Sequence, residues 1–302
     1  TYLETTTIGG TGADAALAIS YSLAGRTFYV GGYFSNTVDM DTGSGTNSKS
    51  SMGAEDGFVS GYIEHSGVTW AGSINSGVQT NAPQDPITMD SSGNVYVFSS
   101  FPGTVDLDIT AGTDSRAAGA KQYAHLSKYQ PDGTYAWTQT LGSTSGNALG
   151  FSVASDLSTG LFAAGYFNGT VDFDLNGAHD SKLTSGAENA AFVTKRTTDG
   201  SYAWTHIIDL SSHVYAYSVA SDLSGNAIAV GAFGGTGDFN DGASSDTHTS
   251  VGAFDVFVVK YNSAGTFQWA KTFGGTGQDQ AHNVATDTNG NIYIAGIFTG
   301  SV

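Results

Sequence analysis

Trp269-Ala-Lys-Thr-Phe-Gly-Gly-Thr-Gly-Gln-Asp-Gln-Ala-His-Asn-Val-Ala-Thr-Asp-Thr-Asn-Gly-Asn-Ile-Tyr-Ile-Ala-Gly-Ile-Phe-Thr-Gly-Ser-Val302 contains a signature, Asp-x-x-Gly-Asn, that begins at Asp287. The signature recurs at Asp222 and Asp90, and in a degraded form at Asp156, with spacings of 65, 66 and 66 residues. The tryptophans keep nearly the same spacing, at Trp70, Trp137, Trp204 and Trp269. A recurrence of this regularity identifies a tandem internal repeat.

A second landmark has the pattern aromatic-x-Gly-Thr-Val-Asp-hydrophobic-Asp and keeps its phase within each repeat. It occurs at Phe101–Asp108 and Phe167–Asp174, and in a looser form at Phe34–Asp41 and Phe233–Asn240. Apolar and polar residues alternate with a period of two, which is typical of β-strands. We predict strands over residues 15–21, 27–34, 56–63 and 68–74 in the first repeat, and over 216–222, 226–239, 255–261 and around Trp269 in the fourth.

The repeats predict an all-β fold, a single β-propeller over residues 1–302 built from four-stranded repeats of about 66 residues. Four full repeats and a half repeat are expected, approximately 1–70, 71–137, 138–204, 205–269 and the partial 270–302. A lone four-stranded sheet cannot bury both faces, so blades around an axis are favoured over a β-solenoid or a string of sandwiches. Polar insertions between the second and third strands, at 43–53, 111–120, 175–187 and 242–252, should lie on one side of the ring.

The composition excludes several classes of protein. The net charge is −17, chiefly because the chain has only 10 Lys and Arg, so nucleic acids and anionic membrane surfaces are not expected as partners. No window approaches the roughly 18 consecutive apolar residues that a membrane helix needs, so membrane insertion is not expected either. The absence of Cys excludes disulfides, thiolate metal sites and a Cys nucleophile. The abundance of small polar residues leads us to expect an extracellular or bacterial cell-surface protein.

Three stretches together resemble a known repeat family. They are Trp-x-Lys-Thr-Phe-Gly-Gly-Thr-Gly-x-Asp from Trp269, Val-Ala-Thr-Asp-x-x-Gly-Asn-Ile-Tyr-Ile-Ala-Gly from Val284, and Asp-x-Phe-Val-Val-Lys-Tyr-x-x-x-Gly from Asp255. They look like the SBBP-type bacterial β-propeller repeat, strongly over residues 205–302 and more weakly over 1–137. Glu4 stands where later repeats have Trp, and Gly61 where they have Lys. The resemblance implies a propeller on secreted or surface bacterial proteins, and it implies no catalytic residues.

The two ends of the repeat array do not make a complete blade. Residues 1–12 match the segment around Trp269–Gly277, so the chain opens on a fourth strand, and residues 270–302 hold only first and second strands. A blade assembled from both ends would lack its third strand, which leaves unpaired backbone edges. We expect either that the chain is a piece of a longer array or that a neighbouring molecule supplies the strand in a head-to-tail polymer. A ring closed in some other way is the remaining alternative.

Paired acids after the second strand are the candidate metal ligands. Asp172-Phe-Asp-Leu-Asn-Gly177 fits the opening of a calcium loop, because alternate residues place oxygen ligands on one side and Gly permits the turn. The twelfth position holds Leu183 instead of Glu. The alternative is that these acids form the solvent face of the second strand and its exit turn. The candidate Ca²⁺ ligands are Asp172, Asp174, Asn176, Asp238, Asn240, Asp106, Asp108, Asp39 and Asp41.

No other constellation carries catalytic chemistry. The Asp-x-x-Gly-Asn aspartates are predicted to cap hairpin turns through side-chain to backbone hydrogen bonds. The seven His fall at different phases of the repeat, and no Gly-x-Ser-x-Gly elbow is present. The tryptophans alternate onto one strand face, where packing between blades is expected and sugar stacking is the alternative. We expect no enzymatic activity and no cofactor other than calcium.

Two functions follow from these patterns. The first is a non-enzymatic, secreted or cell-surface propeller that acts as a structural or adhesive module, with itself, surface glycans or surface proteins as partners. The incomplete terminal blade would let it assemble head-to-tail. The alternative is a calcium-dependent carbohydrate-binding module or glycan-acting enzyme, since propellers host many activities.

Overall fold

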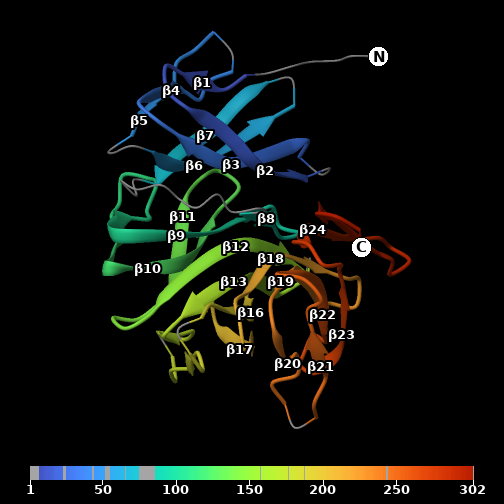
Figure 1. Ribbon diagram of the computed structural model, residues 1–302. Coiled ribbons are helices and arrows are strands. Elements are labelled where there is room, and N and C mark those ends of the chain that lie inside the picture. The colour runs from blue at the N-terminus through green and yellow to red at the C-terminus, as the bar shows by residue number, and fades with distance from the viewer. Residues whose placement is uncertain are drawn as a thin grey trace.

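Every regular element in the described part of the chain is a β-strand. The computed structural model describes residues 7–22, 25–42, 44–51, 55–64, 66–74, 86–156, 158–175, 177–186, 188–242 and 244–301. These ranges hold no helix, and therefore no helix long and apolar enough to cross a membrane. The predicted all-β fold is confirmed (Figure 1).

Four antiparallel four-stranded sheets follow one another along the chain, and we call them blades I to IV. Blade I contains β2 (Asp14–Ser22), β3 (Thr27–Phe34), β6 (Asp56–Ile63) and β7 (Gly67–Ile74). Blade II contains β8 (Ile87–Met89), β9 (Val95–Asp106), β10 (Ser115–Tyr129) and β11 (Tyr135–Leu141). Blade III contains β12 (Asn147–Ser155), β13 (Gly160–Asn168), β16 (Ala190–Thr197) and β17 (Tyr202–Ile208). Blade IV contains β18 (Val214–Ser221), β19 (Ala227–Phe233), β22 (Asp255–Tyr261) and β23 (Phe267–Phe273).

A two-stranded sheet, which we call blade V, follows blade IV. It contains β24 (Gln280–Thr286) and β25 (Ile292–Ile297), the equivalents of the first two strands of the other blades. The first strands β2, β8, β12, β18 and β24 contact one another in series. Figure 1 shows them toward the middle of the molecule, with the hairpins that leave the second strands at its periphery.

Those peripheral hairpins interrupt the second strand of most blades. Their short strands are β4 (Thr37–Asp39), β5 (Ser48–Ser50), β14 (Thr170–Asp172), β15 (Ser181–Leu183), β20 (Thr236–Asp238) and β21 (Thr247–Thr249). A further short strand, β1 (Gly9–Gly10), precedes blade I and pairs with β4. The strand predicted over 226–239 is therefore two strands, β19 and β20, because Gly234 and Gly235 bend the chain away from the blade. The predicted repeat boundaries were placed at the tryptophans, which lie inside the fourth strands. Each four-stranded sheet therefore ends a few residues after the predicted boundary of its repeat.

Each inner blade, II to IV, buries both faces by packing against its neighbours. We call the face toward the preceding blade the leading face and the other the trailing face. Between blades III and IV, the trailing side chains of Phe162 and Val193 pack against the leading side chains of Phe233 and Phe257. Equivalent clusters join blade I to II, blade II to III and blade IV to V. A blade is thus stable only beside another blade.

Tryptophans of the fourth strands reach into the next blade, which confirms their predicted role in packing between blades. The Trp70 indole donates a hydrogen bond to the Pro131 carbonyl at 2.9 Å, and Trp204 donates to the Ser263 carbonyl at 3.4 Å. Each ring lies against the glycine of the turn between the third and fourth strands. A Cβ on Gly265 would stand 2.9 Å from the Trp204 ring.

Gly265→Ala is expected to lower the free energy of unfolding by about 2–3 kcal/mol, because it combines a strained positive φ of 88° with overpacking against Trp204. Gly290→Ala is the matched control, since Gly290 has φ 81° and open space around its Cβ position. The control should cost about 1 kcal/mol. Urea unfolding measures both, and equal losses would mean that the indole contact contributes nothing.

Candidate functional sites

The loop that leaves each second strand is closed by one carboxylate. Oδ1 of this aspartate accepts hydrogen bonds from the backbone N–H groups two and eight residues later, at 2.8–3.1 Å in all four loops. The aspartates are Asp39, Asp106, Asp172 and Asp238. Two N–H groups on one oxygen hold the two ends of the loop together, so we call each of these residues a loop staple.

The second acid of each pair shapes the turn that follows the staple. Asp108 Oδ1 accepts from the Thr110 N–H at 2.9 Å, Asp174 Oδ2 from the Ala178 N–H at 3.0 Å, and Asn240 Oδ1 from the Gly242 N–H at 3.0 Å. Asp41 occupies the same place in blade I, and Asn176 lies outside the described residues. Asp172 and Asp174 are only 7% and 8% exposed, so the interpretation that places them on a solvent face is wrong for this loop.

The hydrogen bonds lower the pKa of the staples Asp39, Asp172 and Asp238. Backbone N–H groups of Asn47 and Asp41 hold the pKa of Asp39 below its usual value. Burial raises the pKa of Asp172, but hydrogen bonds from Asp174 and His179 outweigh it and the pKa is lowered. Within the described ranges, no group of three or more His, Asp or Glu side chains is arranged to hold a metal. Calcium binding therefore stays a prediction of the sequence, and the observed use of these oxygens is structural.

Asp238→Ala should lower the free energy of unfolding by about 1–2 kcal/mol, because two backbone N–H groups lose their acceptor. Urea unfolding should give the same loss in EDTA and in calcium-containing buffer. Asp238→Asn is the control, since its amide oxygen can still accept one or both bonds. A loss that disappears when calcium is removed would identify the loop as a calcium site instead.

Below the loops of blades I, II and III, a third-strand side chain donates to the backbone carbonyl of a buried apolar residue. Tyr62 donates to the Met40 carbonyl at 3.2 Å, and Tyr129 to the Leu107 carbonyl at 3.1 Å. In blade III the donor is Arg196, whose guanidinium reaches the Phe173 carbonyl. A pocket of about 300 Å³ lies beside this blade III loop, lined among others by Gln139, Asp174, Asp199 and Tyr202.

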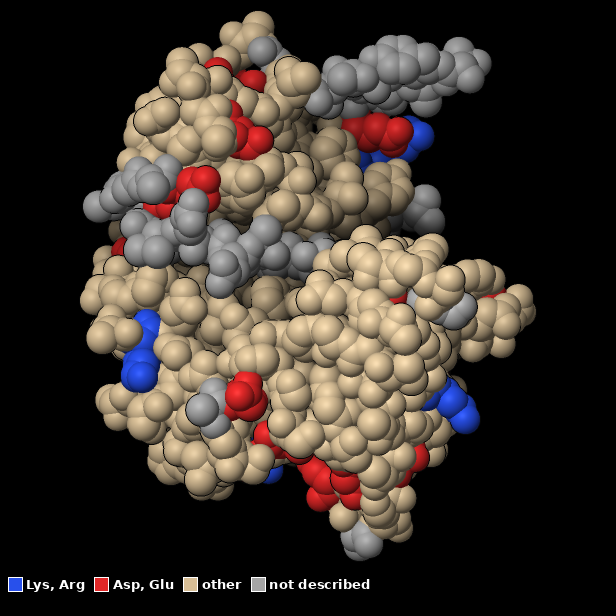
Figure 2. Space-filling model, viewed as in Figure 1, with Lys and Arg blue, Asp and Glu red and all other residues tan. Residues whose placement is uncertain are grey.

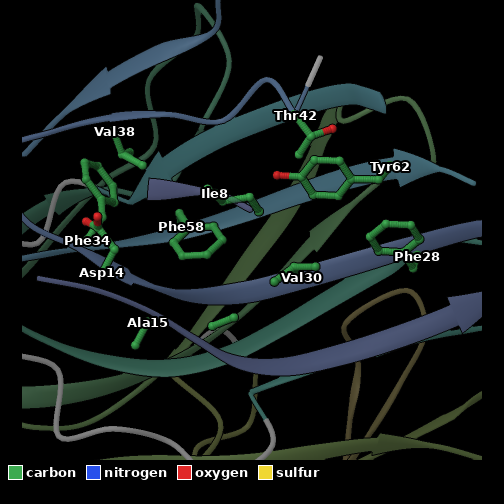
Figure 3. Close-up of a pocket in the computed structure, with 11 residues that line it drawn as sticks. Ile8, Asp14, Ala15, Phe28, Val30, Phe34, Val38, Thr42, Phe58 and Tyr62 are labelled. Atoms are coloured by element: carbon green, nitrogen blue, oxygen red, sulfur yellow. The ribbon is translucent and has the colours of Figure 1, made fainter. Parts of the chain in front are cut away.

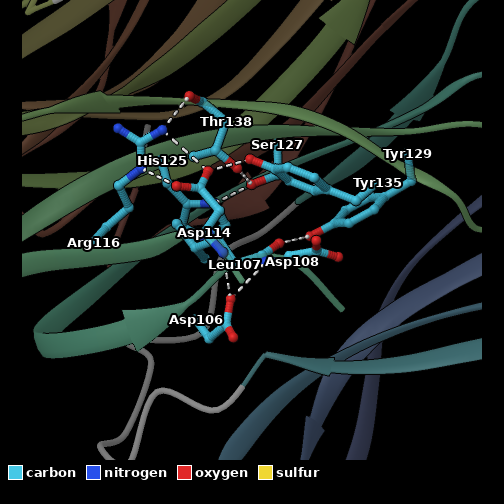
Figure 4. Close-up of polar contacts among 10 residues, drawn as sticks. All are labelled: Asp106, Leu107, Asp108, Asp114, Arg116, His125, Ser127, Tyr129, Tyr135 and Thr138. Atoms are coloured by element: carbon cyan, nitrogen blue, oxygen red, sulfur yellow. Dashed lines mark hydrogen bonds and ion pairs between the residues drawn. The ribbon is translucent and has the colours of Figure 1, made fainter. Parts of the chain in front are cut away.

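Blade II carries a buried Ser–His pair that has no access to a substrate (Figure 4). His125 Nδ1 lies 2.9 Å from Ser127 Oγ, which in turn lies 2.7 Å from Thr138 Oγ1. All three side chains are buried, and burial lowers the pKa of His125 to about 3. Arg116 pairs with Asp114 at 2.7 Å nearby. His125 stands where the other blades have Phe58, Phe192 and Phe257, so this cluster is part of the blade's core.

The turns between first and second strands are capped as predicted. Asp90, Asp156, Asp222 and Asp287 each accept backbone N–H groups from two and four residues later. In blades III and IV the third-strand lysine also approaches the carboxylate. Lys260 Nζ lies 2.7 Å from Asp222 Oδ2, and Lys195 Nζ lies 3.8 Å from Asp156 Oδ2.

The leading face of blade I has no described blade before it. A pocket of about 210 Å³ opens there, and Figure 3 shows Phe28, Val30, Phe34, Phe58 and Tyr62 around it. Ile19 on the same face is 67% exposed, whereas Val153, Val219 and Val284 at the equivalent places are 3–6% exposed. This face lacks the cover that every later blade has.

Blade V is open in the opposite direction. Tyr293 on its trailing face is 58% exposed, while the equivalent Tyr29, Tyr96, Phe162 and Ile228 are at most 2% exposed. Acidic side chains lie on the upper and lower parts of the face in Figure 2, with few Lys or Arg among them. The exposed apolar patches at the two ends of the array are the features that the repeat does not account for.

Comparison with known proteins supports the fold. Residues 268–296 match the family model SBBP, described as a beta-propeller repeat, which confirms the resemblance over that stretch. The chain is also similar to an uncharacterized WD repeat-containing protein of Acanthamoeba polyphaga mimivirus, at 25% identity over 191 residues. That match covers 56% of this chain and 14% of the viral protein. Residues 268–296 therefore form an SBBP-type repeat, and the chain has a β-propeller fold.

Proposed function

We propose that this β-propeller is a non-enzymatic structural or adhesive module of an extracellular or bacterial cell surface, and that it assembles head-to-tail. One observation carries the proposal: the two ends of the blade array expose apolar side chains that every inner blade buries. The leading face of blade I and the trailing face of blade V are the same two kinds of surface that join blades within the chain.

The polar groups support the non-enzymatic part of this proposal. The carboxylates that the repeat presents are loop staples and turn caps, and they recur from blade to blade. The Ser–His pair that differs between blades is buried. The shortage of Lys and Arg favours partners other than nucleic acids, namely a second copy or surface proteins and glycans.

The assembly is tested by sedimentation velocity and electron microscopy of the full chain over a range of concentrations. We expect large or filamentous particles that dissociate in the variants Ile19→Glu and Tyr293→Glu. Leu223→Glu is the control, because Leu223 is exposed on a turn of blade IV away from both faces. Monomers at the highest concentration would refute the polymer, and equal effects of all three variants would refute these faces as its contacts.

A second candidate is glycan binding at the blade III pocket. Its walls combine the Gln139 amide, the Asp174 and Asp199 carboxylates and the Tyr202 ring, which are groups that recognise sugar hydroxyls and sugar faces. Binding on a glycan array that is lost in Gln139→Ala and is unchanged in Leu223→Glu would support it. An array without a reproducible ligand would remove this candidate, whether or not calcium is added.

A further inference from the structure

The blade III pocket lies at the seam between blades II and III. Gln139 belongs to β11 of blade II, Asp174 and Gly177 belong to the blade III loop, and residues 199–202 lie where the turn after β16 enters β17. The volume of about 300 Å³ is at the lower end of the range for small-molecule sites, about 300–1,000 Å³. The pocket is therefore suited to a single sugar unit.

Side chains meet across the same place at the two neighbouring seams. Between blades I and II, Gly72 stands where Gln139 does, and the Ile109 side chain lies so close that a Cβ on Gly72 would be 2.5 Å from it. Between blades III and IV, the equivalent His206 places its Nδ1 2.7 Å from Asp241 Oδ1. The seam between blades II and III instead leaves a pocket, so this pocket is a departure from the repeat.

The walls of the pocket carry two carboxylates. Asp199 Oδ1 accepts hydrogen bonds from the Thr197 hydroxyl and, at 3.1 Å, from the Ser201 N–H. These donors hold the pKa of Asp199 below its usual value, so this carboxylate is ionised at neutral pH. Asp174 Oδ2 accepts from the Ala178 N–H at 3.0 Å. The pocket therefore presents hydrogen-bond acceptors and negative charge to a ligand.

The two carboxylates differ in how far their charge is already balanced. The Arg196 side chain is only 2% exposed, and its guanidinium donates to the Gly200 carbonyl at 3.2 Å. The charge of Asp174 acts on this guanidinium and raises the pKa of Arg196 against the effect of burial. The donors to Asp199 carry no charge, so Asp199 is the carboxylate that a cationic ligand would pair with.

We propose that the blade III pocket binds an amino sugar of a glycan, a sugar whose nitrogen is not acetylated and carries a positive charge. Asp199 pairs with the ammonium group, the Tyr202 ring contacts the face of the sugar, and the Gln139 amide binds a sugar hydroxyl. This inference rests on the glycan binding proposed above as the second candidate function. It adds the class of sugar that the pocket selects.

The test is isothermal titration calorimetry of the full chain with the β-1,4-linked tetrasaccharides of glucosamine, N-acetylglucosamine and glucose. At about pH 6 the amino groups of the glucosamine tetrasaccharide are protonated, whereas the other two tetrasaccharides are neutral. We expect the glucosamine tetrasaccharide to bind about fivefold more tightly than either neutral one. Asp199→Asn should remove this preference, because the amide keeps a hydrogen-bond acceptor and loses the charge.

Asp132→Asn is the matched control. Asp132 holds the same place in the turn of blade II and accepts from the Thr134 N–H at 3.0 Å, but it lies at the seam that Ile109 fills. It removes the same charge from the chain and should leave the affinity for the glucosamine tetrasaccharide unchanged. Gln139→Ala is a second variant that alters the pocket without altering its charge, and it should weaken binding of the glucosamine tetrasaccharide about fivefold.

The other outcomes separate this inference from the glycan binding on which it rests. Equal weakening in Asp199→Asn and Asp132→Asn would mean attraction to the acidic surface as a whole, which overturns the proposal. Equal affinities for the three tetrasaccharides, lost in Gln139→Ala, would refute the preference for an amino sugar and leave glycan binding at this pocket standing. If the glucosamine tetrasaccharide does not bind, a neutral ligand on the glycan array would refute this inference alone, and an array without a ligand would refute both.

Discussion

Arg196→Ala is expected to lower the free energy of unfolding by about 3–5 kcal/mol, the largest loss from any single polar side chain considered. The Arg196 side chain is 2% exposed. Its guanidinium donates to the Gly200 carbonyl at 3.2 Å and to the Phe173 carbonyl, and it lies 5.6 Å from the centre of the Tyr202 ring. Burial lowers the pKa of Arg196, and the charge of Asp174 opposes that shift. Truncation removes the donor and leaves buried acceptors and carboxylates without it.

Arg196→Tyr is the informative partner of that variant. In blades I and II, Tyr62 and Tyr129 donate the equivalent hydrogen bond to a backbone carbonyl. A tyrosine side chain therefore fits this position of the blade. Since it also removes a desolvated charge, we expect a stability within about 1 kcal/mol of the wild type. Urea unfolding measures both variants. A tyrosine variant as unstable as the alanine variant would mean that the positive charge itself holds the blade III loop.

Acid should destabilise the protein in a window set by His125. Burial holds the pKa of His125 at about 3 in the folded protein, whereas an unfolded chain has a His pKa of about 6.5. Below pH 6.5 the unfolded state therefore binds a proton that the folded state does not, and stability falls with decreasing pH. The slope approaches about 1.4 kcal/mol per pH unit, which amounts to about 3 kcal/mol by pH 4.5 and on the order of 4–5 kcal/mol near pH 3.

His125→Phe separates this effect from the titration of other groups. Phenylalanine fills the same place in the other complete blades, and Ser127 keeps its contact with Thr138. The variant should lose about 3 kcal/mol less than the wild type between pH 7 and pH 4.5, a range above the pKa window of the hydrogen-bonded aspartates. Urea unfolding at several pH values measures the difference. Parallel curves for the two proteins would show that His125 is protonated in the folded state.

The strands could be predicted because local signals agree with one another. Residues 56–63 are rich in aromatic and β-branched side chains and end at turn residues, and they form β6 over the same range. The capping role of Asp222 also follows from its short-range pattern. The burial of Asp172 could not be predicted. Alternation of apolar and polar residues distinguishes the two faces of a strand, but it does not show that the following loop covers both of these faces.

The sequence shows some of the positions at which the blades differ from one another. Aligning the third strands puts His125 opposite Phe58 and Arg196 opposite Tyr62, so the sequence contained the signal that one residue in each of two blades departs from the repeat. The exposure of Tyr293 on blade V had a weaker signal. It depends on which strands surround Tyr293, and residue type alone does not show whether a neighbouring strand is present.

The bonds that run from each blade into the next have a further consequence. Lys128 donates to the Thr198 carbonyl and Lys195 to the Ser263 carbonyl, in the same direction as the tryptophans. The array is therefore a short one-dimensional lattice with nearest-neighbour coupling, in which blades at either end have one coupling and inner blades have two. Melting should start at the ends and advance inward. A ligand that binds at one end would raise the melting temperature of blades that it does not contact. The melting temperature of the array therefore reports whether a ligand is bound at its end.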